Sequence, residues 1–366
     1  MTNPSLLPAE NVTFALRSLY DRYGYCRYKM NKFEEYDLYA KNKDFLLCDS
    51  VITFTDTNGK LMALKPDVTL SIVKNTRDEP GIRKLYYNEN VYRVSGGTHT
   101  FKEIIQVGLE AIGDIDEYCI YEVLKLAAES LHSTRRSCIL EISDLGLLSK
   151  ALSCAGIGDE RREEVIRCIG QKSLHELQEI CASLRISESN IALLKKITSL
   201  YGTPDETMDT VRQLFTALGC PEAPERFLRI ISALNAGKYR ELIRIDFSAV
   251  SDPQYYDGFV FKGFAKGVPA AVLSGGQYDA MMRKMKRQAG AIGFAVYLDI
   301  LEQYSSDNSL YDVDTVLLYD GSCSIAEIEA KAKQLTASGE SILLQRQLPP
   351  GLRYRRLVTM TKGGAE

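Results

Sequence analysis

The alternation of apolar and polar residues is clearest between residues 85 and 113, where two predicted strands flank a Gly-rich polar loop. One face of the second strand carries only apolar side chains: Ile105, Val107, Leu109 and Ala111. Its other face presents Gln106, a gap at Gly108 and the carboxyl group of Glu110, and the first strand places Glu89 and Arg93 on a common face. This pattern indicates either a polar pocket for a small charged ligand or an ordinary sheet with one solvated face. The residues alone favour neither interpretation.

The same kind of pattern predicts further elements along the chain. Helices are expected at 11–23, 70–75 and 325–337, and strands at 51–55, 61–64, 137–142, 243–247, 259–264, 268–273, 314–319, 341–345 and 353–360. From about residue 150 to residue 240 the spacing is helical, and no strand pattern interrupts it. We therefore predict an α+β fold with a six- or seven-stranded antiparallel sheet flanked by helices and a helical insertion at 150–240. The expected domains are 1–305 and an α/β piece at 311–366.

Composition narrows the classes of function. The 366 residues are 45% hydrophobic and 25% charged, which is typical of a globular protein, and the formal charge of −3 argues mildly against a nucleic-acid binder. Nine cysteines without a C-x-x-C pair and three histidines support neither a zinc site nor a disulfide framework, so no metal or cofactor is predicted. The start of the chain lacks a signal peptide pattern, and no apolar run reaches the ~20 residues of a membrane span. We expect a cytoplasmic protein without membrane contact.

Two segments resemble motifs of class II aminoacyl-tRNA synthetases. YNENVYRV and FKEIIQVGLEAIG resemble motif 2 in its histidyl-tRNA synthetase form, and GAIGFAVYLDIL at 290–301 resembles motif 3. The resemblance implies the antiparallel sheet of that class. It also implies that Arg93 matches the motif 2 arginine and that Lys102 stands at the position of the loop arginine, so both are candidate phosphate or anion contacts. Leu7-Pro8-Ala9 matches the opening of motif 1 only loosely, and a self-dimer is expected by analogy.

Two shorter segments resemble the parts of histidyl-tRNA synthetase that hold histidine. Lys65-Pro66-Asp67-Val68-Thr69 resembles R-P-E-x-T, which contacts the substrate α-amino group, and the Tyr255-Tyr256 pair resembles the histidine signature Y-Y-T-G-x-x-F. The resemblance implies a histidine site formed by Asp67, Thr69, Gln106, Glu110, Tyr255 and Tyr256. Asp67 or Thr69 could instead cap the helix at 70–75, and adjacent tyrosines also pack in ordinary strands.

The sequence departs from the synthetase pattern where adenylation needs cations. Ile300 occupies the position of the motif 3 arginine, Ser251 that of the arginine before the tyrosine pair, and Gln277 that of the arginine in G-G-R-Y-D. A neutral side chain cannot replace guanidinium against phosphate, and each lost donor costs about 10²–10³ in rate. We therefore assign no catalytic residues.

A synthetase fold that keeps the amino-acid pocket but loses the phosphate contacts resembles the family of ATP phosphoribosyltransferase regulatory subunits. That resemblance implies a non-catalytic subunit that activates the short catalytic subunit of the first step of histidine biosynthesis in a hetero-octamer, with L-histidine as a candidate ligand and no tRNA. The piece at 311–366 resembles about half of an anticodon-binding domain. The alternatives are a divergent histidyl-tRNA synthetase, or a synthetase-like module with another ligand or partner.

Overall fold

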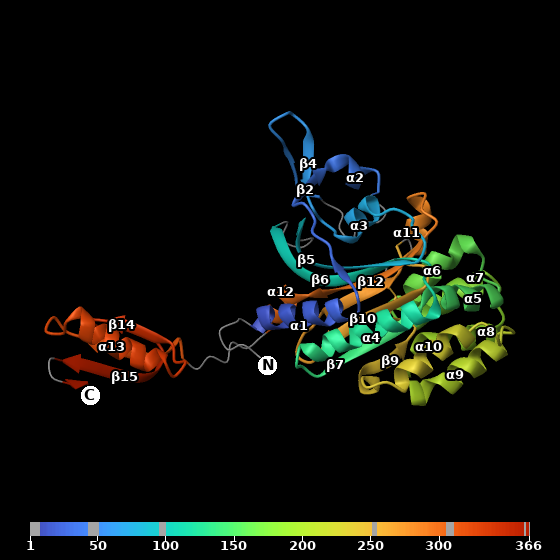
Figure 1. Cartoon of the computed structure of the whole chain (residues 1–366). Coiled ribbons are helices and arrows are strands. Elements are labelled where there is room, and N and C mark those ends of the chain that lie inside the picture. The colour runs from blue at the N-terminus through green and yellow to red at the C-terminus, as the bar shows by residue number, and fades with distance from the viewer. Residues whose placement is uncertain are drawn as a thin grey trace. The chain divides into compact units, whose positions relative to one another are not determined.

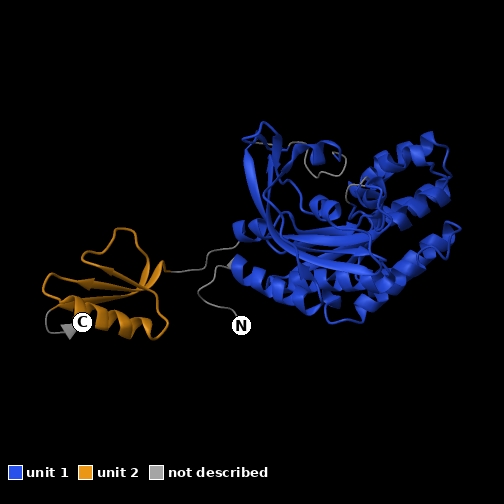
Figure 2. Cartoon of the chain, turned by 45° about the horizontal axis from the view of Figure 1, so that its top comes forward, with its two compact units in different colours: residues 1–304 blue, residues 305–366 orange. Residues whose placement is uncertain are grey.

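The computed structural model describes residues 8–42, 51–94, 100–250, 255–304, 311–361 and 364–365. The chain divides into two compact units, Met1–Tyr304 and Ser305–Glu366, which Figure 2 shows in different colours.

A nine-stranded sheet of described residues forms the centre of the first unit (Figure 1). In spatial order its strands are β1 (Cys26–Arg27), β5 (Ile82–Val94), β6 (Phe101–Gly113), β12 (Gly290–Tyr297), β11 (Ala271–Gln277), β10 (Phe259–Ala265), β7 (Cys138–Asp144), β9 (Ile243–Asp246) and β8 (Tyr201–Gly202). All neighbours are antiparallel except β1 with β5 and β7 with β9. The predicted antiparallel sheet is confirmed, but the predicted strand number is wrong. The two edge strands, β1 and β8, have two residues each, which is too short to produce a sequence period.

The long pair β5 and β6 fixes which side chains meet on the sheet. In its register Tyr87 lies opposite Gly108, and Glu89 lies opposite Gln106. Directly paired residues of antiparallel strands point to the same face, so these four positions share one face with Glu110. The loop residues 95–99 lie outside the described part of the chain.

Helices cover the two faces of the sheet differently. In Figure 1, α1 (Pro8–Arg22) and α4 (Glu117–Ser133) lie on one face, and α3 (Thr69–Asn75) lies on the other. The amphipathic α1 buries Leu16, Leu19 and Tyr20, and the Tyr20 ring lies 6.1 Å from that of Phe294 in β12. The Asp116 side chain caps α4 by accepting a hydrogen bond of 2.7 Å from the Cys119 amide. The apolar face of β6 therefore packs on α1 and α4, and its polar face is turned toward α3.

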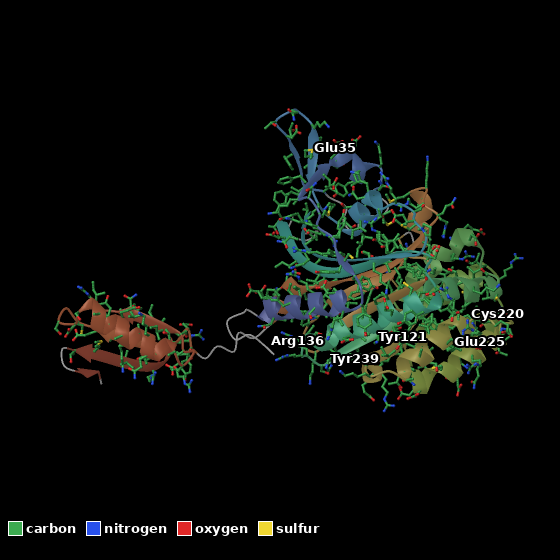
Figure 3. All side chains as sticks on the ribbon, in the orientation of Figure 1. Glu35, Tyr121, Arg136, Cys220, Glu225 and Tyr239 are labelled. Atoms are coloured by element: carbon green, nitrogen blue, oxygen red, sulfur yellow. The ribbon has the colours of Figure 1, made fainter. Side chains whose placement is uncertain are left out.

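The predicted helical insertion is present, with one correction. Its helices are α5 (Leu145–Cys154), α6 (Asp159–Gly170), α7 (Leu174–Ser183), α8 (Glu188–Ser199), α9 (Pro204–Ala217) and α10 (Glu225–Asn235). The chain passes from α9 into α10 between Cys220 and Glu225, both labelled in Figure 3. β8 lies within this stretch, where no strand was expected, because its backbone pairs with β9. A 3-10 turn at Arg240–Leu242 then leads into β9.

A hairpin was predicted around Lys266-Gly267, and its second strand was placed wrongly. β11 runs from Ala271 to Gln277 and not from 268 to 273. The prediction stopped too early because Gly275 and Gly276 resemble loop residues in sequence. In the structure they are central strand residues, since an added Cβ at Gly275 would collide with the Phe294 side chain of β12. Because glycine has no side chain, Gly275 and Gly276 allow β11 to lie close to β12 and to the side chains of the pocket.

Smaller elements complete the first unit. A three-stranded sheet contains β2 (Phe33–Glu35), β4 (Leu61–Leu64) and β3 (Thr53–Thr55), and short helices are α2 (Tyr36–Ala40), α11 (Asp279–Lys284) and α12 (Leu298–Gln303). The predicted turn between β3 and β4 is confirmed, with Gly59 at a φ of 80°. Asp67 precedes α3, and its Oδ1 accepts a hydrogen bond of 2.8 Å from the Leu70 amide. It therefore caps the helix as the sequence suggested.

The second unit is the predicted βαβ piece. It contains β13 (Val313–Tyr319), α13 (Ile325–Thr336), β14 (Ile342–Gln345), β15 (Tyr354–Thr361) and β16 (Gly364–Ala365). β13 pairs in parallel with both β14 and β15. Ser324 and Glu327 form a capping box at the start of α13. In neither unit is any described helix both long and apolar enough to cross a membrane.

Candidate functional site

A polar pocket opens on the face of the sheet that carries Gln106 and Glu110, beside the start of α3. All six residues of the predicted histidine site line it: Asp67, Thr69, Gln106, Glu110, Tyr255 and Tyr256. Arg93 lines it as well, whereas Lys102 does not. Lys102 lies opposite Arg93 in the register of β5 and β6 and is exposed. The structure therefore brings together residues that are almost 190 positions apart in sequence, and it leaves Lys102 outside the pocket.

Glu110 lies at the centre of this pocket. Its side chain is 2% exposed and accepts two hydrogen bonds, one of 2.7 Å from the Thr69 hydroxyl and one of 2.6 Å from the Tyr278 hydroxyl. Gly293 lies directly opposite in β12, and a Cβ there would overlap Oε2 of Glu110. The carboxyl group is thus fixed by two hydroxyl groups and by the absence of a side chain across the sheet.

The second buried carboxyl group belongs to Asp67. It is 6% exposed, and its bond to the Leu70 amide shows that capping α3 and lining the pocket are compatible roles. Arg93 reaches the same region, where its Nε donates a hydrogen bond of 3.0 Å to the carbonyl oxygen of Pro66. In the described part of the chain Arg93 makes no ion pair, so its charge is available to a ligand.

The electrostatics of the pocket favour a bound cation. Burial raises the pKa of Glu110 to about 8, although the hydroxyl groups of Tyr278 and Thr69 lower it, and the nearby charge of Asp67 contributes to the rise. Burial also raises the pKa of Asp67. Among the described lining residues Arg93 is the one cationic side chain, against two carboxyl groups. A donor-rich positive group, such as an ammonium, would restore the ionised form of Glu110 by charge-assisted hydrogen bonds.

Tyrosine rings form the apolar wall. The centroids of the Tyr255 and Tyr256 rings are 4.5 Å apart, and the Tyr278 ring is 5.8 Å from that of Tyr255. Gly276 makes room for this arrangement, because a Cβ there would lie 2.6 Å from Cδ1 of Tyr256. Such a wall suits a planar ring with polar edges, since each tyrosine combines an aromatic face with a hydroxyl group.

Sequence reasoning missed four polar lining residues: Tyr87, Ser274, Tyr278 and Tyr297. Tyr87 alternates with Glu89 along β5, so the strand period already placed it on the pocket face. Tyr278 directly follows the Gly-rich motif that was noted for its Gln277. In both cases the prediction considered the charged or amide residue and overlooked a tyrosine in the same strand or motif.

The free volume in the pocket is small. It measures about 30 Å³, which is enough for water-sized groups but not for an amino acid. A larger ligand therefore enters only if side chains at the rim move. Of the described residues, no group of three or more His, Cys, Asp or Glu side chains is arranged to hold a metal ion.

Other residues noted in the sequence lie elsewhere. Glu89 forms an ion pair with the buried Lys65 and does not line the pocket. Gln277 also lies outside the lining, and Ile300 is half-buried in α12, where it packs against the core. Ser251 lies outside the described residues. The structure thus separates this pocket from most of the described positions that correspond to arginines of the synthetase pattern.

The chain was compared with known proteins. The family model for histidyl-tRNA synthetase matches residues 4–301. Curated relatives include the ATP phosphoribosyltransferase regulatory subunits of Oceanobacillus iheyensis, 22% identical over 93% of this chain and 85% of the relative, and of Clostridium acetobutylicum, 25% identical over 90% and 84%.

Solved structures show the same fold. An ATP phosphoribosyltransferase regulatory subunit/histidyl-tRNA synthetase from Bacillus halodurans superposes with a TM-score of 0.74 at 23% identity, covering 98% of this chain and 96% of that one. The ATP phosphoribosyl transferase (HisG:HisZ) complex from Thermotoga maritima contains a chain that matches with a TM-score of 0.61 at 20% identity, over 80% of this chain and 98% of that one. The chain described here therefore belongs to the histidyl-tRNA synthetase-like family, in which the curated relatives named above are ATP phosphoribosyltransferase regulatory subunits.

Proposed function

We propose that this protein is a non-catalytic regulatory subunit of ATP phosphoribosyltransferase. It activates a short catalytic subunit in the first step of histidine biosynthesis and conveys feedback inhibition by L-histidine. The names of the relatives and the partnership in the Thermotoga maritima complex support this role. By resemblance to the family, the chain forms a self-dimer within a hetero-octamer and binds no tRNA.

The observation on which the histidine role depends is the pair of buried carboxyl groups beside a tyrosine wall. The ammonium group of histidine would donate to Asp67 and Glu110, and its imidazole would lie against Tyr255 and Tyr256. The sequence alone offered no clear partner for the carboxylate of the ligand. Arg93 supplies one, because its guanidinium group lines the same pocket without an ion pair among the described residues.

We expect no adenylation because too few cationic side chains remain in the pocket. Stabilising the charge that develops on ATP during adenylation needs several fixed positive groups. Arg93 stands alone in the pocket lining, Lys102 is exposed outside it, and Ile300 packs against the core at the position that corresponds to the motif 3 arginine. We propose that the chain retains a pocket for the amino acid and lacks the means to activate it.

The decisive experiment measures two activities of the purified chain. Added to a short ATP phosphoribosyltransferase catalytic subunit, it should co-elute with that subunit and increase its rate. Alone, it should show no histidine-dependent exchange of pyrophosphate into ATP above that of a mock purification, which controls for contaminating synthetase. Exchange well above the mock level would favour a divergent histidyl-tRNA synthetase. Separate elution with an unchanged rate would exclude the regulatory role.

The histidine pocket is tested by Glu110→Gln, which keeps the shape of the side chain and removes its charge. A charge-assisted hydrogen bond contributes roughly 1.5–3 kcal/mol, so the inhibition constant for histidine should rise at least about tenfold. Glu103→Gln is the matched control, because Glu103 is an exposed residue of the same strand. If Glu110→Gln leaves inhibition unchanged in a correctly assembled complex, histidine acts elsewhere, with the catalytic subunit as the first alternative.

A further inference from the structure

A second cavity of about 380 Å³ is lined by residues of α5, of α10 and of the carboxyl end of β11. It shares no lining residue with the pocket around Glu110. Its free volume is more than ten times that of the first pocket.

The wall of this cavity contains a buried amide oxygen without a donor. Gln277 is 6% exposed, and its Nε2 donates a hydrogen bond of 2.7 Å to Asp279 Oδ2, which fixes the orientation of the amide. Among the described residues its Oε1 has no hydrogen-bond partner, and it lies beside Gly258, which also lines the cavity. A buried acceptor of this kind is rare in folded proteins and is a sign of a missing donor.

Asp257 supplies a second acceptor in the same wall. Its Oδ2 accepts a hydrogen bond of 2.6 Å from Arg283, while its Oδ1 is buried and has no partner in the described part of the chain. Asp144 lines the cavity too, but its Oδ1 already caps α5 by accepting from the Leu147 amide at 2.9 Å. The inner wall therefore offers two unused acceptors, one of them on a carboxylate, which suits a positively charged donor.

The rim carries the opposite charge. Lys150 of α5 and Arg226 of α10 line the cavity and are exposed, and within the described chain neither belongs to an ion pair. Arg226 is the residue after Glu225, which is labelled in Figure 3. Between rim and wall, Leu147 and Phe227 contribute buried apolar surface. The acceptors of the inner wall suit the ammonium group of an amino acid, and the cations of the rim suit its carboxylate. The apolar residues between them suit its side chain.

We propose that this cavity binds a free α-amino acid. Its ammonium group donates to Asp257 Oδ1 and Gln277 Oε1, its carboxylate binds Lys150 and Arg226, and its side chain packs on Phe227. This site is distinct from the proposed histidine pocket and does not depend on it.

The cavity is also placed to communicate with the first pocket. Asp257 directly follows Tyr256, and Gln277 directly precedes Tyr278, so each unused acceptor is adjacent in sequence to a tyrosine that lines the first pocket. The Asp257 amide donates a hydrogen bond of 3.1 Å to the carbonyl oxygen of Gln277, which joins the two segments. An amino acid in the second cavity contacts the same short backbone segments that position the tyrosine wall.

The test uses the purified full-length chain. Each standard L-amino acid is added at millimolar concentration, thermal stabilisation is recorded, and those that stabilise the protein are titrated by calorimetry. At least one should bind, and the Lys150→Ala/Arg226→Ala double variant should weaken that binding about tenfold or more, because charge-assisted bonds to the carboxylate are lost. The control double variant Arg167→Ala/Lys196→Ala removes exposed charges of α6 and α8 outside both cavities and should bind as the wild type does.

Thr69→Val separates the two sites, because Thr69 lines only the first pocket. An amino acid that occupies the second cavity binds Thr69→Val normally, and its analogues without the ammonium or without the carboxylate bind about tenfold more weakly. The proposal is overturned if no amino acid binds, if the rim variant binds as the wild type does, or if Thr69→Val abolishes all binding. Failure of the regulatory role leaves this test unaffected, because no partner chain is used.

Discussion

Glu110 shows how much of a site depends on the protonation of one residue. The strand pattern predicted its position beside Gln106, but the pattern contains no information on burial. The structure surrounds the carboxyl group with Thr69, Tyr278 and Gly293, and desolvation raises its pKa to about 8. At neutral pH the group is therefore mostly protonated in the protein alone, and an ammonium ligand must displace a proton to pair with it.

This proton predicts how stability depends on pH. The folded pKa of Glu110 lies above its ordinary value of 4.5, so the native state holds a proton that the unfolded chain releases. The resulting stabilisation is full below that ordinary value and is lost as pH rises toward 8, with a slope of up to about 1.4 kcal/mol per pH unit. Glu110→Gln cannot ionise, so its free energy of unfolding should rise relative to that of the wild type across this range. Urea denaturation at several pH values measures this difference in the free energy of unfolding. Glu103→Gln should show no such rise over the same pH range. A pH-independent difference for Glu110→Gln would mean that Glu110 is ionised throughout.

Gly293 is predicted to be as important to the pocket as any charged residue. Gly293→Ala would place a methyl group on Glu110 Oε2 and displace the carboxyl group from Thr69 and Tyr278. Overpacking of this kind costs roughly 1–3 kcal/mol of stability, and histidine binding should be lost with it. Gly321→Ala is the control, because a Cβ at Gly321 meets no other atom within 4 Å. Calorimetric titration with histidine decides the matter, and unchanged binding by Gly293→Ala would show that Glu110 is not a ligand.

At the scale of elements, the strand and helix periods predicted most of the fold. The pairing of β5 with β6, the hairpin of β3 and β4, and the βαβ piece of the second unit all follow from local pattern and turn residues. Among the elements that the sequence missed or misplaced are β1 and β8, which are stabilised by neighbouring strands, and β11, whose glycines allow a close approach across the sheet. Contacts with residues distant in sequence determine each of these three strands, and such contacts cannot be recognised in a window of ten residues.

The same limit applies to the candidate site. Motif resemblance identified Asp67, Thr69 and the tyrosine pair, but only the three-dimensional structure shows that Arg93 reaches them and that Lys102 does not. Arg93 and Lys102 are register partners on adjacent strands and look equivalent in sequence. The difference arises because the Arg93 guanidinium hydrogen-bonds to the Pro66 carbonyl oxygen, next to Asp67.

A buried ion pair links the small sheet to the central one. Lys65, which follows β4 and is 1% exposed, pairs with Glu89 of β5, and Glu89 also accepts a hydrogen bond of 3.3 Å from the Met30 amide. Lys65→Met leaves Glu89 without its cation and should cost roughly 3–5 kcal/mol of stability. The double variant Lys65→Met/Glu89→Gln should recover much of that loss, since glutamine still accepts from Met30 and carries no charge. Chemical denaturation of the wild type, the single variants Lys65→Met and Glu89→Gln, and the double variant measures the coupling, and strictly additive effects would argue against a direct pair.

At the scale of the whole molecule, the division into two units separates the pocket from the C-terminal βαβ piece. Both cavities lie within the first unit, as does the whole segment matched by the synthetase family model. The second unit has its own small core, in which Val316, Leu317 and Leu335 are buried. The two units therefore have the means to fold independently.

The division predicts that residues 1–304 are sufficient for the regulatory role. Both cavities and the whole segment matched by the family model lie within these residues. A protein ending at Tyr304 should fold, elute with the short catalytic subunit and increase its activity as the full chain does. The Ile300→Arg variant of this shorter protein should still lack pyrophosphate exchange, because one restored guanidinium does not replace the other missing cations. Size-exclusion chromatography and the phosphoribosyltransferase assay test the first claim. If the shorter protein is folded by circular dichroism yet fails to bind the catalytic subunit, the C-terminal unit contributes to the partner interface, and the role of the βαβ piece must be sought there.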